Sequence, residues 1–232
     1  MYLPMFNPMY YLFALPALLL GMYAQHKVRS TYSKYLEVRN RYNVTGYEAA
    51  QRLLRMQGLQ DVQVKETGGQ LSDHYNPKEK TLALSQNVAR SPSLASLAIV
   101  AHEMGHAVQD QRDYMPLRLR SGLVPVVQIG SWLGPILFLG GMFFPIQNLS
   151  LIGLLLFSGT LVFSLVTLPV EFDASRRAVA MLRDGQMITR EEVDGAREVL
   201  SAAALTYVAA AAQALSTILY YAFLLSGSRR RR

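Results

Sequence analysis

Two histidines and a glutamate are the residues of this sequence whose types and spacing best suit chemistry. They lie in the segment His102-Glu-Met-Gly-His106. Residues four apart leave the same face of a helix, so both imidazoles could reach one Zn²⁺ at about 2.0–2.1 Å. Glu103 would stand beside the metal and could take a proton from water that the cation activates. This HExxH pattern is typical of metal-assisted peptide hydrolysis.

A surface helix with two unrelated histidines is the simpler alternative. The segment argues against it, because Leu97, Ile99, Val100 and Val108 make the predicted helix largely apolar. Buried imidazoles and a buried carboxylate need polar partners. A bound metal would supply them, and we therefore expect a zinc site.

A catalytic zinc takes three protein ligands and water, so a third ligand is needed. The chain has no cysteine. The candidates are Glu171, His26 and His74. Glu171 follows a long uncharged stretch and could instead interact with a helix dipole, while His26 lies at an expected membrane boundary. From spacing alone, Glu171 is the strongest candidate.

Three charged residues soon after Glu171 leave alternatives open. Asp173 could accept a hydrogen bond from one of the two motif histidines, or it could be solvated. Arg176 and Arg177 could pair with Asp173, hold substrate, or contact phospholipid headgroups.

His74, in Leu71-Ser-Asp-His-Tyr75, is the remaining candidate for catalysis. It could hydrogen-bond a developing oxyanion or orient a bound peptide. It could also be an ordinary polar residue of a strand, and that strand could pair with an extended peptide. We predict a catalytic role for His74 beside that of Glu103.

The composition places these residues in a membrane protein. Charged residues make up 17% of the chain, below the roughly 25% of an average soluble protein. No charged residue or histidine occurs in Met1–Gln25 or in Ser121–Val170. Such runs exclude an ordinary soluble domain and a disordered chain. The net charge of +7 indicates contact with the lipid bilayer and no nucleic acid partner.

About 20 apolar residues cross the hydrocarbon core, and four segments meet that length. The predicted spans are Tyr2–Ala24, Leu123–Phe144, Leu149–Leu168 and Ala202–Leu225. They divide the chain into a first transmembrane helix (1–25), a polar domain (26–120), two transmembrane helices (121–170), a polar helical segment with the third zinc ligand (171–200), and a last transmembrane helix with a basic tail (201–232).

Charge sets the expected orientation in the membrane. Two spans separate the polar segments, so both lie on one side, and they hold 14 and 5 Lys and Arg residues. The positive-inside rule places them in the cytoplasm. Arg229–Arg232 would then lie outside, against the rule. We expect a multi-pass protein of the cell membrane with its active site facing the cytoplasm.

Local signals predict the fold of the polar domain. Thr45-Gly-Tyr-Glu48 is a capping box that starts a helix ending at Gly58. Alternation and turn residues predict strands at about 62–65, 71–75 and 80–85. Ser91-Pro92 predicts the start of the HExxH helix, with Ser91 as N-cap. The expected fold is mostly α, with four transmembrane helices and a small α+β zincin-like domain on the cytoplasmic face.

Glu171 predicts the start of a separate helix that runs to about Arg183 and ends at Asp184-Gly185. A second capping box, Thr189-Arg-Glu-Glu192, predicts the start of a helix that could continue into the last span.

Over nearly its whole length, the chain resembles the YugP-type neutral zinc metallopeptidases of bacterial membranes. The resemblance is carried by Leu71-Ser-Asp-His-Tyr-Asn-Pro77, His102–His106, Pro116-Leu-Arg-Leu-Arg-Ser121, Leu168–Arg177 and Ala202–Ala209. It implies a membrane-bound, zinc-dependent peptidase. Similarity to the broader HtpX and CAAX-prenyl-protease group implies Glu171 as third ligand. That group has Asp four residues after its ligand Glu, whereas this chain has Ser175 there and Asp173 two residues on.

Together these features predict a zinc-dependent endopeptidase acting on membrane or membrane-associated proteins at the cytoplasmic surface. The alternative is a non-catalytic, zinc-stabilised membrane scaffold or regulator. The presence of Glu103 favours the enzyme.

Overall fold

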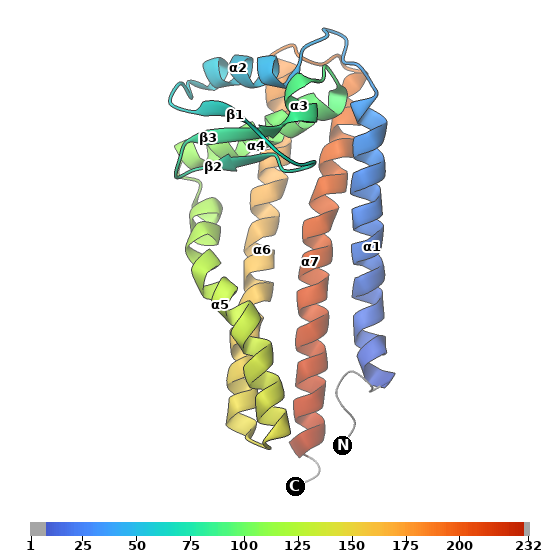
Figure 1. Ribbon diagram of the computed structural model, residues 1–232, viewed down its shortest axis with the longest axis vertical. Helices are drawn as coiled ribbons and strands as arrows, with labels where there is room; N and C mark the ends of the chain where they lie inside the picture. Colours follow the sequence, from blue (N-terminus) through green and yellow to red (C-terminus); the bar gives the residue numbers. More distant parts are fainter. Residues whose placement is uncertain (1–7, 230–232) are drawn as a thin grey trace. The chain divides into compact units, whose positions relative to one another are not determined.

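The structure is a computed structural model that describes residues 8–229 (Figure 1). This part of the chain is mostly helical and contains one small sheet. Its elements are α1 (Pro8–Leu36), α2 (Gly46–Gln57), β1 (Gln63–Thr67), β2 (His74–Asn76), β3 (Thr81–Ser85), α3 (Gln86–Arg90), α4 (Leu94–Gln111), α5 (Met115–Phe143), α6 (Gln147–Asp184) and α7 (Glu192–Arg229).

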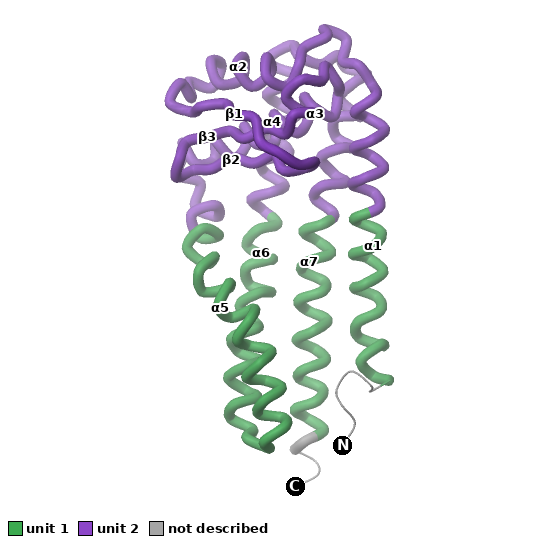
Figure 2. Tube along the Cα trace, viewed as in Figure 1, with its two compact units in different colours: residues 1–25, 119–168, 206–232 green, residues 26–118, 169–205 purple. Residues whose placement is uncertain are grey.

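The chain divides into two compact units (Figure 2). The first, the apolar unit, comprises residues 1–25, 119–168 and 206–232. The second, the polar unit, comprises residues 26–118 and 169–205. Helices α1, α5, α6 and α7 each contribute residues to both units.

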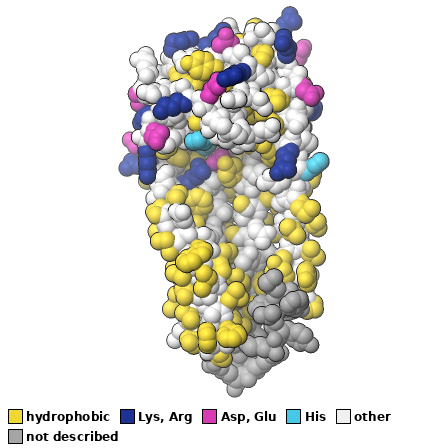
Figure 3. Space-filling model, viewed as in Figure 1, with side chains coloured by type: hydrophobic (Ala, Val, Ile, Leu, Met, Phe, Trp, Pro, Cys, Tyr) yellow, Lys and Arg dark blue, Asp and Glu magenta, His cyan; other side chains and the backbone are white. Residues whose placement is uncertain are grey.

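In the apolar unit, large hydrophobic side chains are exposed over the helices (Figure 3). Trp132 is 70% exposed and Leu155 is 65% exposed, which is typical of a lipid-facing surface. Three described helices, α5, α6 and α7, are long and apolar enough to cross a membrane. This supports the expectation of a membrane protein. The expected first span lies on α1, and its residues 2–7, like Arg230–Arg232 of the tail, lie outside the described residues.

The polar unit is built around the sheet, whose strand order is β1-β3-β2. The central strand β3 pairs parallel with β1 and antiparallel with β2, with Tyr75 opposite Leu82. All residues of β3 are buried, as expected for a strand covered on both faces. Strand β2 is at the edge of the sheet and contacts α4. Helix α4 also packs against α2.

The capping box that starts α2 is confirmed. Thr45 Oγ1 accepts from the Glu48 backbone N–H at 3.2 Å, and the Glu48 carboxylate accepts from the Thr45 N–H at 2.9 Å. Gly58 ends the helix with φ of +68°, a left-handed conformation that costs glycine little.

Two predicted boundaries are wrong. The HExxH helix begins at Leu94, with Ser93 as N-cap accepting from the Ser96 N–H at 3.1 Å. Ser91 instead caps the C-terminus of the short helix α3. The reason is that Pro92 and Ser93 pair with a distant segment: the Pro92 carbonyl accepts from the Asn40 N–H at 3.0 Å, and Ser93 forms a β-bridge with Arg39. The new helix therefore starts only after Ser93.

The second error concerns α6, which is one continuous helix where we expected a span and a separate helix starting at Glu171. Pro169 lies inside it. The last residues of the predicted span and Glu171 therefore share one helical backbone. Membrane helices tolerate an internal proline when the freed carbonyl finds another partner.

Candidate active site

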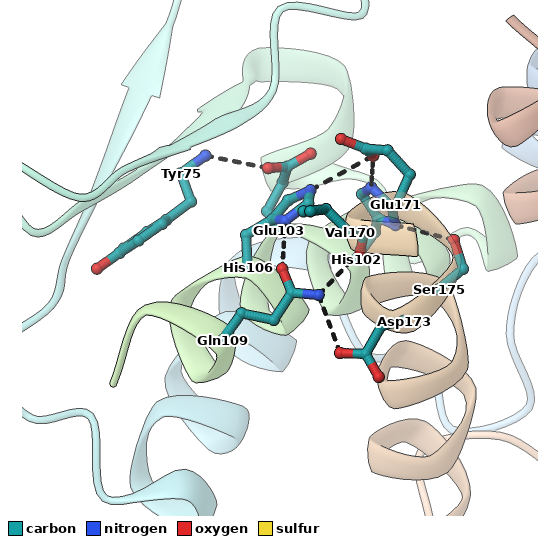
Figure 4. A network of polar contacts seen from close by, with 9 residues as sticks. All are labelled: Tyr75, His102, Glu103, His106, Gln109, Val170, Glu171, Asp173 and Ser175. Carbon is teal, nitrogen blue, oxygen red and sulfur yellow. Dashed lines mark hydrogen bonds and ion pairs between the residues drawn. The ribbon is translucent and has the colours of Figure 1, made fainter. Parts of the chain in front are cut away.

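The two motif histidines lie one turn apart on α4 and point to the same side (Figure 4). The centres of the His102 and His106 rings are 4.8 Å apart. Both side chains are mostly buried. Their spacing follows directly from the helical repeat, in which residues i and i+4 are neighbours.

Glu171 brings a carboxylate to both rings from α6. Its Oε2 lies 3.2 Å from His102 Nε2 and 3.5 Å from His106 Nε2, and the residue is only 1% exposed. One ligand atom from each of the three residues lies within 4.8 Å of the others.

These separations fit a single zinc ion. Ligands about 2.0–2.1 Å from a tetrahedral centre lie about 3.3–3.4 Å apart. The two measured nitrogen–oxygen distances, 3.2 and 3.5 Å, bracket that value. Two imidazoles and one carboxylate are also a donor set that zinc enzymes use, with a fourth position left for water.

Gly105 allows α4 and α6 to approach closely enough for this geometry. A Cβ atom at position 105 would lie 2.7 Å from the Ala174 carbonyl oxygen and 3.0 Å from the Ala174 Cα. Both contacts are with backbone, which cannot rotate away. A side chain at position 105 would therefore push apart the helices that carry the histidines and Glu171.

Each histidine has a polar partner behind it. His106 Nδ1 lies 3.0 Å from Gln109 Oε1, and His102 Nδ1 lies 3.2 Å from Ser175 Oγ. An amide oxygen only accepts hydrogen bonds, so His106 carries its hydrogen on Nδ1. Partners of this kind hold the ring in place and leave the Nε2 lone pair for a metal.

Asp173 lies behind the Gln109 amide and not against a histidine. Its Oδ2 accepts from Gln109 Nε2 at 2.9 Å and from Arg177 Nε at 2.6 Å, and its Oδ1 accepts from Arg176 Nη2 at 3.1 Å. Burial opposes its ionisation, but the hydrogen bonds from Gln109 and Arg177 outweigh burial and lower the pKa of Asp173. The expected direct contact with His102 or His106 is thus replaced by a contact through an amide.

Glu103 lies beside the three clustered residues and is held by β2. Its Oε2 accepts from the Tyr75 backbone N–H at 3.0 Å. The Tyr75 hydroxyl donates to Asp110 at 2.9 Å, and Lys80 Nζ donates to the same carboxylate at 2.6 Å. Glu103 and Asp110 are seven residues apart and share a face of α4, so Tyr75 fixes the strand against the helix at two points.

The ionisable groups of the site favour the binding of a cation. Burial raises the pKa of the Glu103 carboxyl. Burial also opposes ionisation of Glu171, but hydrogen bonds with His102 and His106 outweigh it and lower the pKa of Glu171. For His106, burial favours the neutral ring, yet the hydrogen bond to Glu171 prevails and raises its pKa. A buried carboxylate that stabilises positive charge on its neighbours would do the same for a metal ion.

His74 and His26 lie outside the clustered group. His74 is exposed on β2, and its Nδ1 lies 2.8 Å from the Ser72 carbonyl oxygen. It is the backbone of the next residue, Tyr75, that contacts Glu103. The catalytic role of His74 stays a prediction.

Sequence reasoning missed Gln109, Ser175 and the Tyr75 backbone as members of the site. Gln109 lies three residues after His106, a helical neighbour that could have been singled out. In the sequence, Ser175 stands out only as a departure from a family pattern. The Tyr75 contact joins residues 28 apart in sequence, and no local signal marks it.

Comparison with known proteins agrees with this chemistry. A family model described as "Putative neutral zinc metallopeptidase" matches residues 10–226. The chain is 43% identical over 213 residues to the "Putative membrane protease YugP" of Bacillus subtilis (strain 168), covering 92% of this chain and 95% of that protein. No solved structure matches. The chain therefore belongs to the neutral zinc metallopeptidase family.

Proposed function

We propose that this protein is a membrane-embedded, zinc-dependent endopeptidase, with His102, His106 and Glu171 as zinc ligands. The observation that carries the proposal is the meeting of Glu171 Oε2 with both histidine Nε2 atoms, at 3.2 and 3.5 Å, with Glu103 beside them. Its proposed substrates are membrane or membrane-associated proteins, because the helix that carries Glu171 also contains an apolar stretch long enough to cross a membrane.

When bound, zinc supplies Lewis-acid chemistry, polarising a carbonyl oxygen and acidifying water. Glu103 accepts the proton of the attacking water and later delivers it to the leaving amine. Burial raises the pKa of the Glu103 carboxyl, the direction that strengthens the carboxylate as a base. The Tyr75 N–H already occupies Oε2, so we assign the transferred proton to Oε1.

His74 could stabilise an oxyanion in only one protonation state. Its Nδ1 faces a carbonyl oxygen, which can only accept, so the neutral ring has its lone pair on Nε2. Stabilising an oxyanion would therefore require the imidazolium form.

We further propose four membrane spans, with α1 as the first, in the cell membrane. The positive-inside rule supports a cytoplasmic position for the polar segments that hold the site. Labelling of single cysteines introduced at exposed positions of the polar segments, such as Glu79, would test this orientation, since the natural chain has no cysteine.

The Glu103→Gln variant tests the enzymatic mechanism. We expect it to retain zinc and to lose cleavage of an unfolded protein such as casein, because Gln keeps the shape but cannot accept the water proton. Glu79→Gln, an exposed carboxylate on the same unit, is the matched control and should cleave normally. Cleavage by Glu103→Gln at the wild-type rate would refute the assigned role. A wild-type protein that binds zinc and cleaves neither casein nor membrane proteins would favour the scaffold alternative.

A further inference from the structure

Gln109 has every hydrogen-bonding atom of its side chain engaged, although it is fully buried on α4. Its Oε1 accepts from His106 Nδ1 at 3.0 Å. Its Nε2 donates to the Val170 carbonyl oxygen at 2.8 Å and to Asp173 Oδ2 at 2.9 Å (Figure 4). A carboxamide offers two N–H donors and one carbonyl acceptor, and here all three have partners.

The orientation of this amide is fixed by what surrounds it. A carbonyl oxygen and a carboxylate oxygen can only accept hydrogen bonds. If the amide were rotated by 180°, Oε1 would face these two acceptors, and neither N–H group of Nε2 could donate to them. Nε2 must therefore face Val170 and Asp173, which turns Oε1 toward His106.

We propose that Gln109 is a positioning residue that selects the metal-binding tautomer of His106. This inference rests on the proposed zinc site. With Oε1 as its neighbour, the His106 ring must carry hydrogen on Nδ1, which leaves the Nε2 lone pair facing Glu171. The same amide holds the carbonyl of Val170, the residue before Glu171, so one side chain orients a histidine ligand and anchors the backbone of the carboxylate ligand.

A purely structural role for Gln109 makes different predictions from a positioning role. If the amide only joined α4 to α6, the worst replacement would be Gln109→Glu, which places a second carboxylate against Asp173. If the amide selects the tautomer, Gln109→Met is worse for metal binding, because methionine has a similar shape but offers His106 no oxygen acceptor. Glutamate keeps that acceptor.

The test is the zinc affinity of the full chain in detergent, measured by competition with a chromophoric chelator. Thermal unfolding of the metal-free proteins gives a separate measure of folding. The matched control is Asn40→Leu, since Asn40 is another buried carboxamide of the same unit. Its Nδ2 donates a hydrogen bond to the Val44 carbonyl at 2.8 Å, and its Oδ1 accepts one from the Val44 N–H at 2.9 Å. It lies outside the clustered residues.

We expect Gln109→Met to weaken zinc binding about 10–100-fold, the usual loss when a partner of a metal ligand is removed. Gln109→Glu should recover part of that loss. Asn40→Leu should lower the melting temperature of the metal-free chain without changing zinc affinity. Zinc affinity that is unchanged in Gln109→Met, or lower in Gln109→Glu than in Gln109→Met, would overturn the positioning role while leaving the zinc site intact. A wild-type chain that binds no zinc would instead refute the proposed function.

Discussion

The close approach of α4 and α6 at Gly105 makes Gly105→Ala the most informative structural perturbation. The added methyl carbon would lie 2.7 Å from the Ala174 carbonyl oxygen, whereas ordinary contacts begin at 3.4 Å. The shortfall is about 0.7 Å. Because the obstructing atoms belong to the backbone, no side-chain rotation relieves the clash, and the helices must separate.

A displacement of about 0.7 Å between the two helices is larger than the variation in ligand distance that a zinc site tolerates. Zinc–ligand distances hold to within about 0.2 Å, and Glu171 lies only three residues before Ala174 on the same helix. Overpacking costs about 1–3 kcal/mol, but alanine is favoured over glycine in a helix by about 1 kcal/mol. The free energy of unfolding of the metal-free protein should therefore fall by only about 0–2 kcal/mol, while zinc affinity falls by about tenfold or more.

The assay is chelator competition for zinc together with thermal unfolding of the metal-free chain. Gly122→Ala is the matched control, because Gly122 is also inside a helix but a Cβ there would meet nothing within 4 Å. It should leave zinc affinity unchanged. If Gly105→Ala binds zinc as tightly as the wild type, the α4–α6 contact does not set the ligand spacing, and the reasoning fails.

Three further predictions concern the support of the site and of its domain. Ser175→Ala removes the oxygen 3.2 Å from His102 Nδ1 and should weaken zinc binding about tenfold in the same competition assay; an unchanged affinity would exclude that support. Thr45→Ala removes the capping box of α2 and should lower the free energy of unfolding by about 1 kcal/mol, with no change in zinc affinity. Chelation of zinc should lower the melting temperature of the wild type, since a ligand at a hundredfold excess over its dissociation constant adds about 2.7 kcal/mol; Glu171→Ala should show no such drop.

Sequence reasoning succeeded where the determining interaction is local. The capping box at Thr45 and Glu48 spans four residues, and the two histidines meet through the repeat of a single helix. Each pattern carries its own physical cause, so it could be recognised without the rest of the fold. The same kind of reasoning failed at Ser91, because Pro92 and Ser93 pair with the distant residues Arg39 and Asn40, and Ser93 becomes the N-cap instead.

Apart from Glu171, which the need for a third zinc ligand singled out, contacts between distant segments could not be derived in this way. The Gln109 amide meets Val170, 61 residues away, only because α4 and α6 cross at Gly105. A charged residue near Glu171 could be identified as a candidate partner for a histidine, and Asp173 was. That a neutral amide would lie between them depends on helix packing that the sequence does not display.

The central claim is that two histidines and one glutamate hold zinc, and counting bound metal tests it most directly. Metal content per chain would be measured by mass spectrometry on the wild type, Glu171→Ala and His74→Ala, each purified in detergent. We predict close to one zinc per chain in the wild type and in His74→Ala, and its loss in Glu171→Ala. Zinc retained without Glu171 but lost without His74 would contradict the account and indicate a site of three histidines.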